Sequence, residues 1–88
     1  MHSHLAKMLG LLLKETRHKK GITQKKLAQK IGVSAQFLGR VEHGEVMIPL
    51  SALKRSIKFL SLSEKKLIMI YRTAGTETAR DLFHKMKK

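Results

Sequence analysis

Apolar residues recur along this chain at spacings of three and four, the period of helices that bury one face. The pattern predicts six helices, over residues 4–19, 24–30, 34–43, 50–60, 64–72 and 77–87. Glycines and serines that suit turns and helix caps separate the predicted helices. The chain is therefore expected to be all-α.

The second and third predicted helices are short and are separated by a tight turn. Leu27 and Ile31 lie four residues apart on one face of the second helix, and Leu38 and Val41 lie three apart on one face of the third. Gly32 stands between the two helices, where a left-handed backbone conformation costs little only for glycine. The two apolar faces are thus placed to pack against each other across the turn.

Three small or apolar residues fit the same corner. Ala28 is small at the point where two helices crossing at roughly 90–120° come closest. Val33 can fill the corner after the turn, and the Ser34 hydroxyl can cap the third helix. Together these spacings predict a helix-turn-helix.

The chain resembles the phage-repressor-like (Xre/Cro-type) helix-turn-helix DNA-binding family. The resemblance is carried by Thr23-Gln24, Leu27-Ala28, Ile31-Gly32-Val33-Ser34 and Val41-Glu42-His43-Gly44. It implies a lambda-repressor-like domain of five short helices, here followed by an extra C-terminal helix. We expect a DNA-binding domain over 1–72 and a C-terminal extension over 73–88.

The resemblance also implies roles for three polar residues. Arg17 would form a structural ion pair with Glu42 at the end of the third helix, although direct contact with a phosphate is the alternative for Arg17. Gln24 would contact the DNA backbone and brace the third helix.

The third helix is expected to be the recognition helix, with Leu38 and Val41 turned inward. Such a helix enters the major groove with its N-terminal residues at base edges. An amide can pair with adenine and a guanidinium with guanine, while small side chains contact thymine methyl groups. The expected base-reading residues are Ser34, Ala35, Gln36 and Arg40. Arg40 could instead hold a phosphate, and Phe37 packs either at the core edge, which we favour, or against DNA.

The N-terminus of the second helix exposes backbone N–H groups that can bind a phosphate. The expected phosphate-binding residues are Gln24, Lys25, Lys26, Lys30 and His43. For the lysines, a solvated surface is an almost equally good interpretation.

The overall charge agrees with a polyanionic partner. Lysine and arginine total 19 against six acidic residues, giving a net charge of +13 over 88 residues. Such an excess favours nucleic acid over an anionic membrane surface. Charge supplies affinity and salt dependence, but no sequence preference.

The last two predicted helices carry more apolar surface than one monomer face needs. We expect a dimer or partner interface at Leu67, Met69, Ile70, Leu82, Phe83 and Met86. Leu11 and Leu13 lie off the inward stripe of the first helix and are candidates for the same contact. The alternative is that the C-terminal helix completes the core of its own chain.

Catalytic and metal-binding patterns are not found. The chain has no cysteine, five scattered histidines and six acidic residues without the spacing of an acid–base pair. We therefore expect neither an enzyme nor a metal or cofactor. No segment has the roughly 20 apolar residues of a membrane span, and no secretion signal is evident, so a cytoplasmic location is expected.

The favoured hypothesis is a sequence-specific regulator of transcription, of prokaryotic or phage type, that represses by binding a near-palindromic operator in double-stranded DNA as a homodimer. An antitoxin or adaptor that chiefly binds a protein partner, such as a toxin, is the alternative. A nucleic-acid-binding protein driven by charge alone is less well supported, because the chain has only three Phe and one Tyr for stacking on RNA bases.

Overall fold

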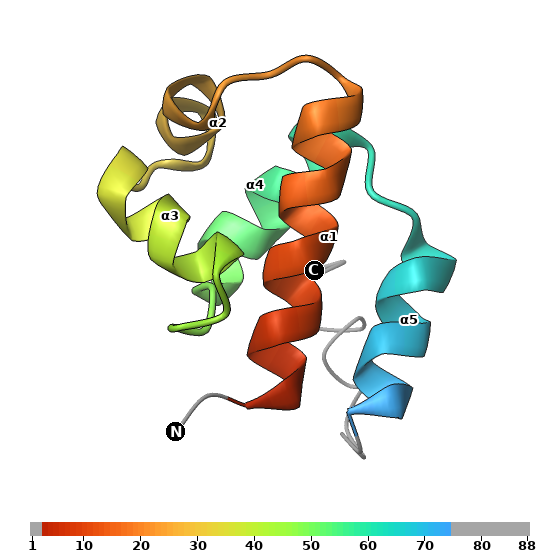
Figure 1. Ribbon diagram of the computed structural model, residues 1–88. Coiled ribbons are helices and arrows are strands. Elements are labelled where there is room, and N and C mark those ends of the chain that lie inside the picture. Colours follow the sequence, from red (N-terminus) through yellow and green to blue (C-terminus); the bar gives the residue numbers. More distant parts are fainter. Residues whose placement is uncertain (1–2, 75–88) are drawn as a thin grey trace.

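The computed structural model describes residues 3–74, which form five α-helices and contain no strand (Figure 1). The helices are α1 (His4–Lys19), α2 (Gln24–Ile31), α3 (Ala35–Glu42), α4 (Leu50–Leu60) and α5 (Glu64–Thr73). Each boundary lies within one residue of the one predicted from the sequence, and the all-α fold is confirmed. The sixth predicted helix, 77–87, lies outside the described residues.

Hydroxyl side chains begin four of the five helices. Each accepts a hydrogen bond from the backbone N–H three residues later, at 3.0–3.3 Å, and these residues are Ser3, Thr23, Ser34 and Ser63. Pro49 precedes α4 and makes no side-chain cap. The short connections between helices are therefore fixed by local hydrogen bonds as well as by packing.

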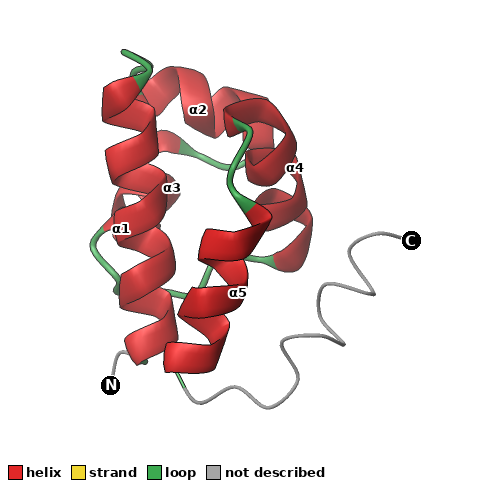
Figure 2. Ribbon diagram, turned by 90° about the vertical axis from the view of Figure 1, so that its right-hand side faces the viewer, coloured by secondary structure: helices red, strands yellow, loops and turns green. Residues whose placement is uncertain are grey.

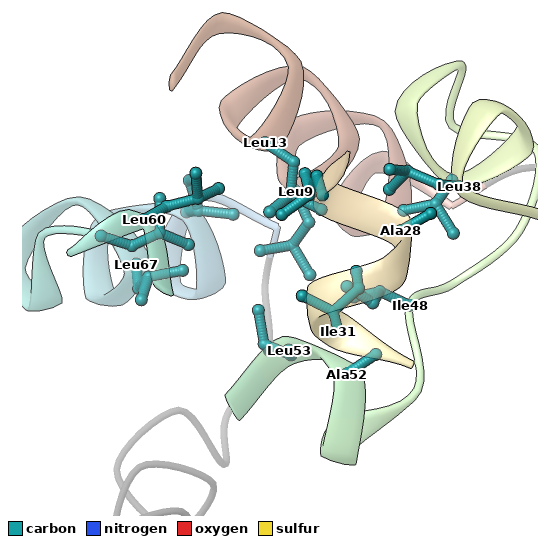
Figure 3. Close-up of a cluster of buried hydrophobic side chains, with 14 of the residues drawn as sticks. Leu9, Leu13, Ala28, Ile31, Leu38, Ile48, Ala52, Leu53, Leu60 and Leu67 are labelled. Atoms are coloured by element: carbon teal, nitrogen blue, oxygen red, sulfur yellow. The ribbon is translucent and has the colours of Figure 1, made fainter. Parts of the chain in front are cut away.

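One hydrophobic cluster joins all five helices (Figure 3). Leu27, Leu38, Leu60 and Leu67 are fully buried in it, and Leu9 of α1 is 1% exposed. Because α2, α3 and α4 are short, each is stabilised by this shared core more than by its own helical propensity.

Three apolar residues lie where the sequence pattern did not place them. Leu13 is 1% exposed and belongs to the core, because α1 is covered on two sides, by α3 and by α5. Leu67 is 0% exposed, so it cannot contribute to an interface, although this was predicted. The helical spacing of Leu50 from Leu53 and Leu60 predicts that it faces inward, yet Leu50 is 41% exposed at the first position of α4.

The arrangement of the helices separates two faces of the molecule. Figure 1 places α2 and α3 on one side of α1 and α5 on the other. Figure 2 shows α5 alongside α1, which it contacts. No helix within residues 3–74 has the length and apolar character needed to cross a membrane.

Candidate nucleic-acid interface

The helix α3 presents one polar face to solvent. Leu38 and Val41 are at most 1% exposed and hold the helix on the core. The residues predicted to read bases are all exposed: Ser34, Ala35, Gln36 and Arg40. Phe37 is half-buried and packs against the core cluster, as favoured from the sequence. The exposed side of α3 can therefore meet a partner without disturbing the core.

The turn before α3 has the predicted geometry. Gly32 ends α2 with φ 78° and ψ 31°, a left-handed conformation that disfavours any other residue. Val33 is half-buried against the core, and the Ser34 hydroxyl accepts a hydrogen bond from the Phe37 N–H at 3.0 Å. These contacts fix the direction in which α3 leaves the turn.

A buried ion pair fixes the other end of α3. Arg17 donates from Nε to Glu42 Oε2 at 2.8 Å and from a terminal nitrogen to Glu42 Oε1 at 3.1 Å. The two side chains are 10% and 1% exposed. A further Arg17 nitrogen donates to the Ile22 carbonyl at 3.0 Å, in the α1–α2 connection. Arg17 thus acts as a structural residue that ties α1, the following loop and α3 together.

Gln24 joins the same network from the start of α2. Its Nε2 donates to Glu42 Oε1 at 3.0 Å, so α2 is also linked to the end of α3. Gly39 lies beneath this side chain, and a Cβ at position 39 would be in ordinary van der Waals contact with Gln24 Nε2, at 3.4 Å. The Gln24 amide therefore lies across the surface of α3 and braces this helix.

Arg40 and His43 extend the exposed face. The Arg40 Nε lies 3.9 Å from Glu45 Oε1, and both side chains are about half exposed, at 54% and 48%. Such a pair is too long for a hydrogen bond and contributes little stability. The His43 Nδ1 lies 2.7 Å from the Gly39 carbonyl, which only accepts, so Nδ1 donates and the ring is held on the helix surface.

The three lysines predicted to bind phosphates do not form one cluster. Lys25 and Lys26 are exposed in the first turn of α2, beside the N–H groups of its N-terminus. Lys30 lies at the other end of α2, with Nζ 5.8 Å from the centroid of the Phe59 ring in α4. This cation–π contact places Lys30 away from the start of α2.

Arg55 was not predicted to have a role at this surface. It is exposed on α4, but one of its terminal nitrogens donates to the Ile31 carbonyl at 3.3 Å, at the end of α2. No local sequence pattern could identify it, because the contact depends on how α4 crosses α2.

The loop after α3 carries an apolar run, Val46-Met47-Ile48, for which the sequence predicts burial or protein contact, and the structure divides this run. Ile48 is 5% exposed and Val46 is half-buried, whereas Met47 is 43% exposed. Within residues 3–74, no group of three or more His, Cys, Asp or Glu side chains is placed to hold a metal ion.

Comparisons with known proteins agree with this geometry. The crystal structure of the clp gene regulator ClgR from Corynebacterium glutamicum is similar, with a TM-score of 0.69 and 26% sequence identity over 92% of this chain and 87% of that one. A comparison with curated protein sequences gives no match. Residues 8–68, well over half of the chain, match the model of a helix-turn-helix domain. This chain therefore belongs to the helix-turn-helix domain family.

Proposed function

We propose that the protein is a sequence-specific regulator of transcription that inserts α3 into the major groove of double-stranded DNA. The observation that carries the proposal is the exposed polar face of α3, held by a buried apolar face and by the Arg17–Glu42 pair. A helix fixed at both ends and open on one side is what major-groove reading requires. Membership of the helix-turn-helix family, and similarity to a gene regulator, support the same function.

Base reading is assigned to the exposed side chains of α3. Gln36 carries an amide that can pair bidentately with adenine, and Arg40 carries a guanidinium that can pair with guanine. Ala35 offers apolar contact to a thymine methyl, and Ser34 offers a hydroxyl at the start of the helix. Because Arg40 has only a weak contact with Glu45, little stability is lost when it turns toward a base.

Phosphate binding is assigned to residues around this face. The start of α2 presents Lys25, Lys26 and its backbone N–H groups, and His43 lies at the end of α3. Gln24 would contact the backbone while it braces Glu42. Lys30 would act through its charge at the C-terminal end of α2. These contacts set affinity and register, while α3 sets base preference.

The homodimer in this proposal would use the face formed by α1 and α5. A groove there is lined by Met8, Leu11, Leu12, Glu15, Lys66, Met69, Ile70 and Thr73. Leu11 is 54% exposed and Met69 is 65% exposed, so the groove carries exposed apolar surface of the kind that marks an interaction site. We propose a second copy as the occupant, because two recognition helices about 34 Å apart would match a near-palindromic site. Leu82, Phe83 and Met86 lie outside the described residues and remain proposed members of this interface.

Repression would follow from occupation of an operator that overlaps a promoter, in the cytoplasm. Binding rather than catalysis would be the whole activity, with no cofactor required. The net charge of +13 would speed the search for a site through non-specific attraction to DNA.

The experiment that tests the proposal is selection of bound fragments from genomic DNA with purified protein, followed by affinity measurements on the best fragment. We expect a short inverted repeat. The Gln36→Ala variant should lose base preference at one position in each half-site, at a cost of about 1–3 kcal/mol. Gln29→Ala is the matched control, because Gln29 is an exposed glutamine on α2 with no assigned contact.

The outcomes separate this function from its alternative. Fragments without a shared sequence, and affinity that follows only ionic strength, would overturn specific regulation. Equal effects of Gln36→Ala and Gln29→Ala would remove the reading role of α3. Sequence-indifferent binding together with a stable protein complex would instead favour the antitoxin or adaptor function.

The dimer is tested separately by sedimentation of variants in which an exposed methionine becomes lysine. Met69→Lys should give monomers, whereas Met47→Lys, at an exposed methionine in the α3–α4 loop, should not. A dimer that survives Met69→Lys would place the contact elsewhere and remove the α1–α5 face from the proposal.

A further inference from the structure

Arg55 lies against the turn of the helix-turn-helix, although it belongs to α4. Its terminal nitrogen donates to the Ile31 carbonyl at 3.3 Å. The same nitrogen would lie 2.8 Å from a Cβ at position 32, so the glycine there provides the space for the guanidinium. The guanidinium therefore borders the segment that leads, two residues later, into Ser34 and the start of α3.

Most of the hydrogen-bonding capacity of Arg55 is left unused within the fold. A guanidinium has five N–H donors, and among the described residues Arg55 makes one hydrogen bond, which is long. The residue is exposed, so the remaining donors face solvent. Capping the end of α2 needs only one N–H donor. The planar guanidinium of Arg55 therefore has donors left for a further partner.

A second cation lies at the same end of α2. Lys30 is held over the ring of Phe59, which lies four residues after Arg55 on α4 and therefore on the same side of that helix. Both positive charges are thus held at the C-terminal end of α2, close to the turn. The acidic residues described in the chain do not share this location: Glu15 lies on the α1–α5 face, Glu42 is buried, Glu45 is close to Arg40, and Glu64 begins α5.

We propose that Arg55 is a phosphate-binding residue, which holds one DNA backbone phosphate at the turn of the helix-turn-helix. The capping hydrogen bond to Ile31 orients the guanidinium, and its other donors pair with the phosphate oxygens in the bidentate manner that arginine favours. Lys30 adds positive potential next to the same site. The site extends the interface from the helix-turn-helix onto α4 and rests on the proposed DNA-binding function.

The test is the salt dependence of binding to the selected DNA fragment by the full-length protein. Each phosphate neutralised contributes about 0.9 to the slope of log K against log salt. Arg55→Gln should lower this slope by about that amount for each half-site, weaken binding roughly tenfold and leave base preference unchanged. Arg55→Lys should keep the slope, because the positive charge remains. It should still bind more weakly than the wild type, because an ammonium group cannot make the bidentate contact of a guanidinium.

Lys54→Gln is the matched control. Lys54 is an exposed cation on the same helix, but it lies on the far side from the buried residues Ala52, Leu53 and Ser56 and so points away from α2. It should change neither the slope nor the affinity beyond a small general effect of net charge.

A second measurement separates phosphate binding from a merely structural role. DNA fragments can be made with one phosphate at a time replaced by a neutral methylphosphonate. At one position per half-site, this replacement should lower the affinity of the wild-type protein but leave the affinity of Arg55→Gln unchanged. A weaker cap on α2 would instead reduce affinity for every fragment alike and leave the slope unchanged.

The outcomes also distinguish this proposal from the one it rests on. Specific binding with an unchanged slope for Arg55→Gln, or with equal effects of Arg55→Gln and Lys54→Gln, overturns the Arg55 site alone. No specific binding by the wild-type protein overturns both proposals.

Discussion

Gly10 of α1 lies directly against the backbone carbonyl of Val41 in α3, at a distance that leaves no room for a Cβ atom. Gly44, just after α3, lies in the same way against Lys7 of α1, with φ 74°. The first helix therefore packs on the end of α3 more closely than side chains would allow. This contact brings Arg17 and Glu42, farther along α1 and at the end of α3, within hydrogen-bonding distance.

The first prediction concerns this close contact. Gly10→Ala should lower the free energy of unfolding by about 1–3 kcal/mol, because α1 or α3 must move to admit the methyl group. The loss should appear even though alanine favours a helix by about 1 kcal/mol over glycine. Urea denaturation followed by circular dichroism measures the difference.

Gly39→Ala is the control for this prediction. Gly39 is also a helical glycine, but a Cβ there would be in ordinary contact with the flexible Gln24 side chain, at 3.4 Å. The free energy of unfolding of the Gly39→Ala variant should rise by up to about 1 kcal/mol. If both alanine variants were stabilised, the close packing of α1 on α3 would be contradicted.

The helices could be predicted from the sequence because each repeats its signals locally. Apolar spacing predicted the bounds of all five described helices to within one residue. It was aided by a capping hydroxyl at the start of four helices and by a glycine just after α1, α2 and α3. The role of Gly10 could not be predicted, because a glycine within a helical pattern indicates only a weaker helix. Leu13 was misplaced for a related reason: one inward stripe was assigned to α1, which is covered on two sides.

The candidate site could be predicted where it depends on one helix and not where it depends on several. The outward face of α3 follows from the positions of Leu38 and Val41 alone. The Arg17–Glu42 pair joins residues 25 positions apart and was implied by family resemblance, not by spacing. The contacts of Lys30 with Phe59 and of Arg55 with Ile31 join α2 to α4, and no periodic pattern encodes a crossing between helices.

The second prediction concerns the buried ion pair. Glu42→Gln should destabilise the protein by about 3–5 kcal/mol, because it leaves the Arg17 guanidinium buried beside a neutral amide. The double variant Arg17→Met with Glu42→Leu should cost less than Glu42→Gln, since neither charge then remains uncompensated. Urea denaturation of both variants measures this order, and the reverse order would show that the pair itself supplies most of the stability.

The third prediction concerns the end of α4. Ser61 has φ 53° and ψ 49° and is the one non-glycine residue of the described chain with positive φ. Ser61→Gly should raise the free energy of unfolding by roughly 0.5–1 kcal/mol, because glycine adopts this conformation without the cost of a Cβ. Thermal denaturation tests the change.

The matched variant for Ser61 is Ser63→Gly. Ser63 caps α5 through its hydroxyl, which accepts a hydrogen bond from the Lys66 N–H at 3.3 Å, and its φ is −68°. Glycine there should lower stability by a few tenths of a kcal/mol. A loss of stability in Ser61→Gly would mean that the serine side chain contributes more than its backbone conformation costs.

The fourth prediction concerns stability at alkaline pH. Burial in the core raises the pKa of the Tyr71 hydroxyl above its ordinary value of 10.0, because the phenolate is poorly solvated there. Since the folded state holds this proton more tightly than the unfolded state, the contribution to stability is complete below pH 10.0 and is lost as pH rises through the folded pKa. Wild-type protein should therefore lose stability above pH 10.0 more steeply than Tyr71→Phe, in which lysine titration is the same.

Tyr71 is the only tyrosine and the chain has no tryptophan, so ultraviolet absorbance of tyrosinate in the folded protein reports its titration directly. Parallel pH dependences of the two proteins, or tyrosinate formation at the ordinary pKa, would contradict the prediction.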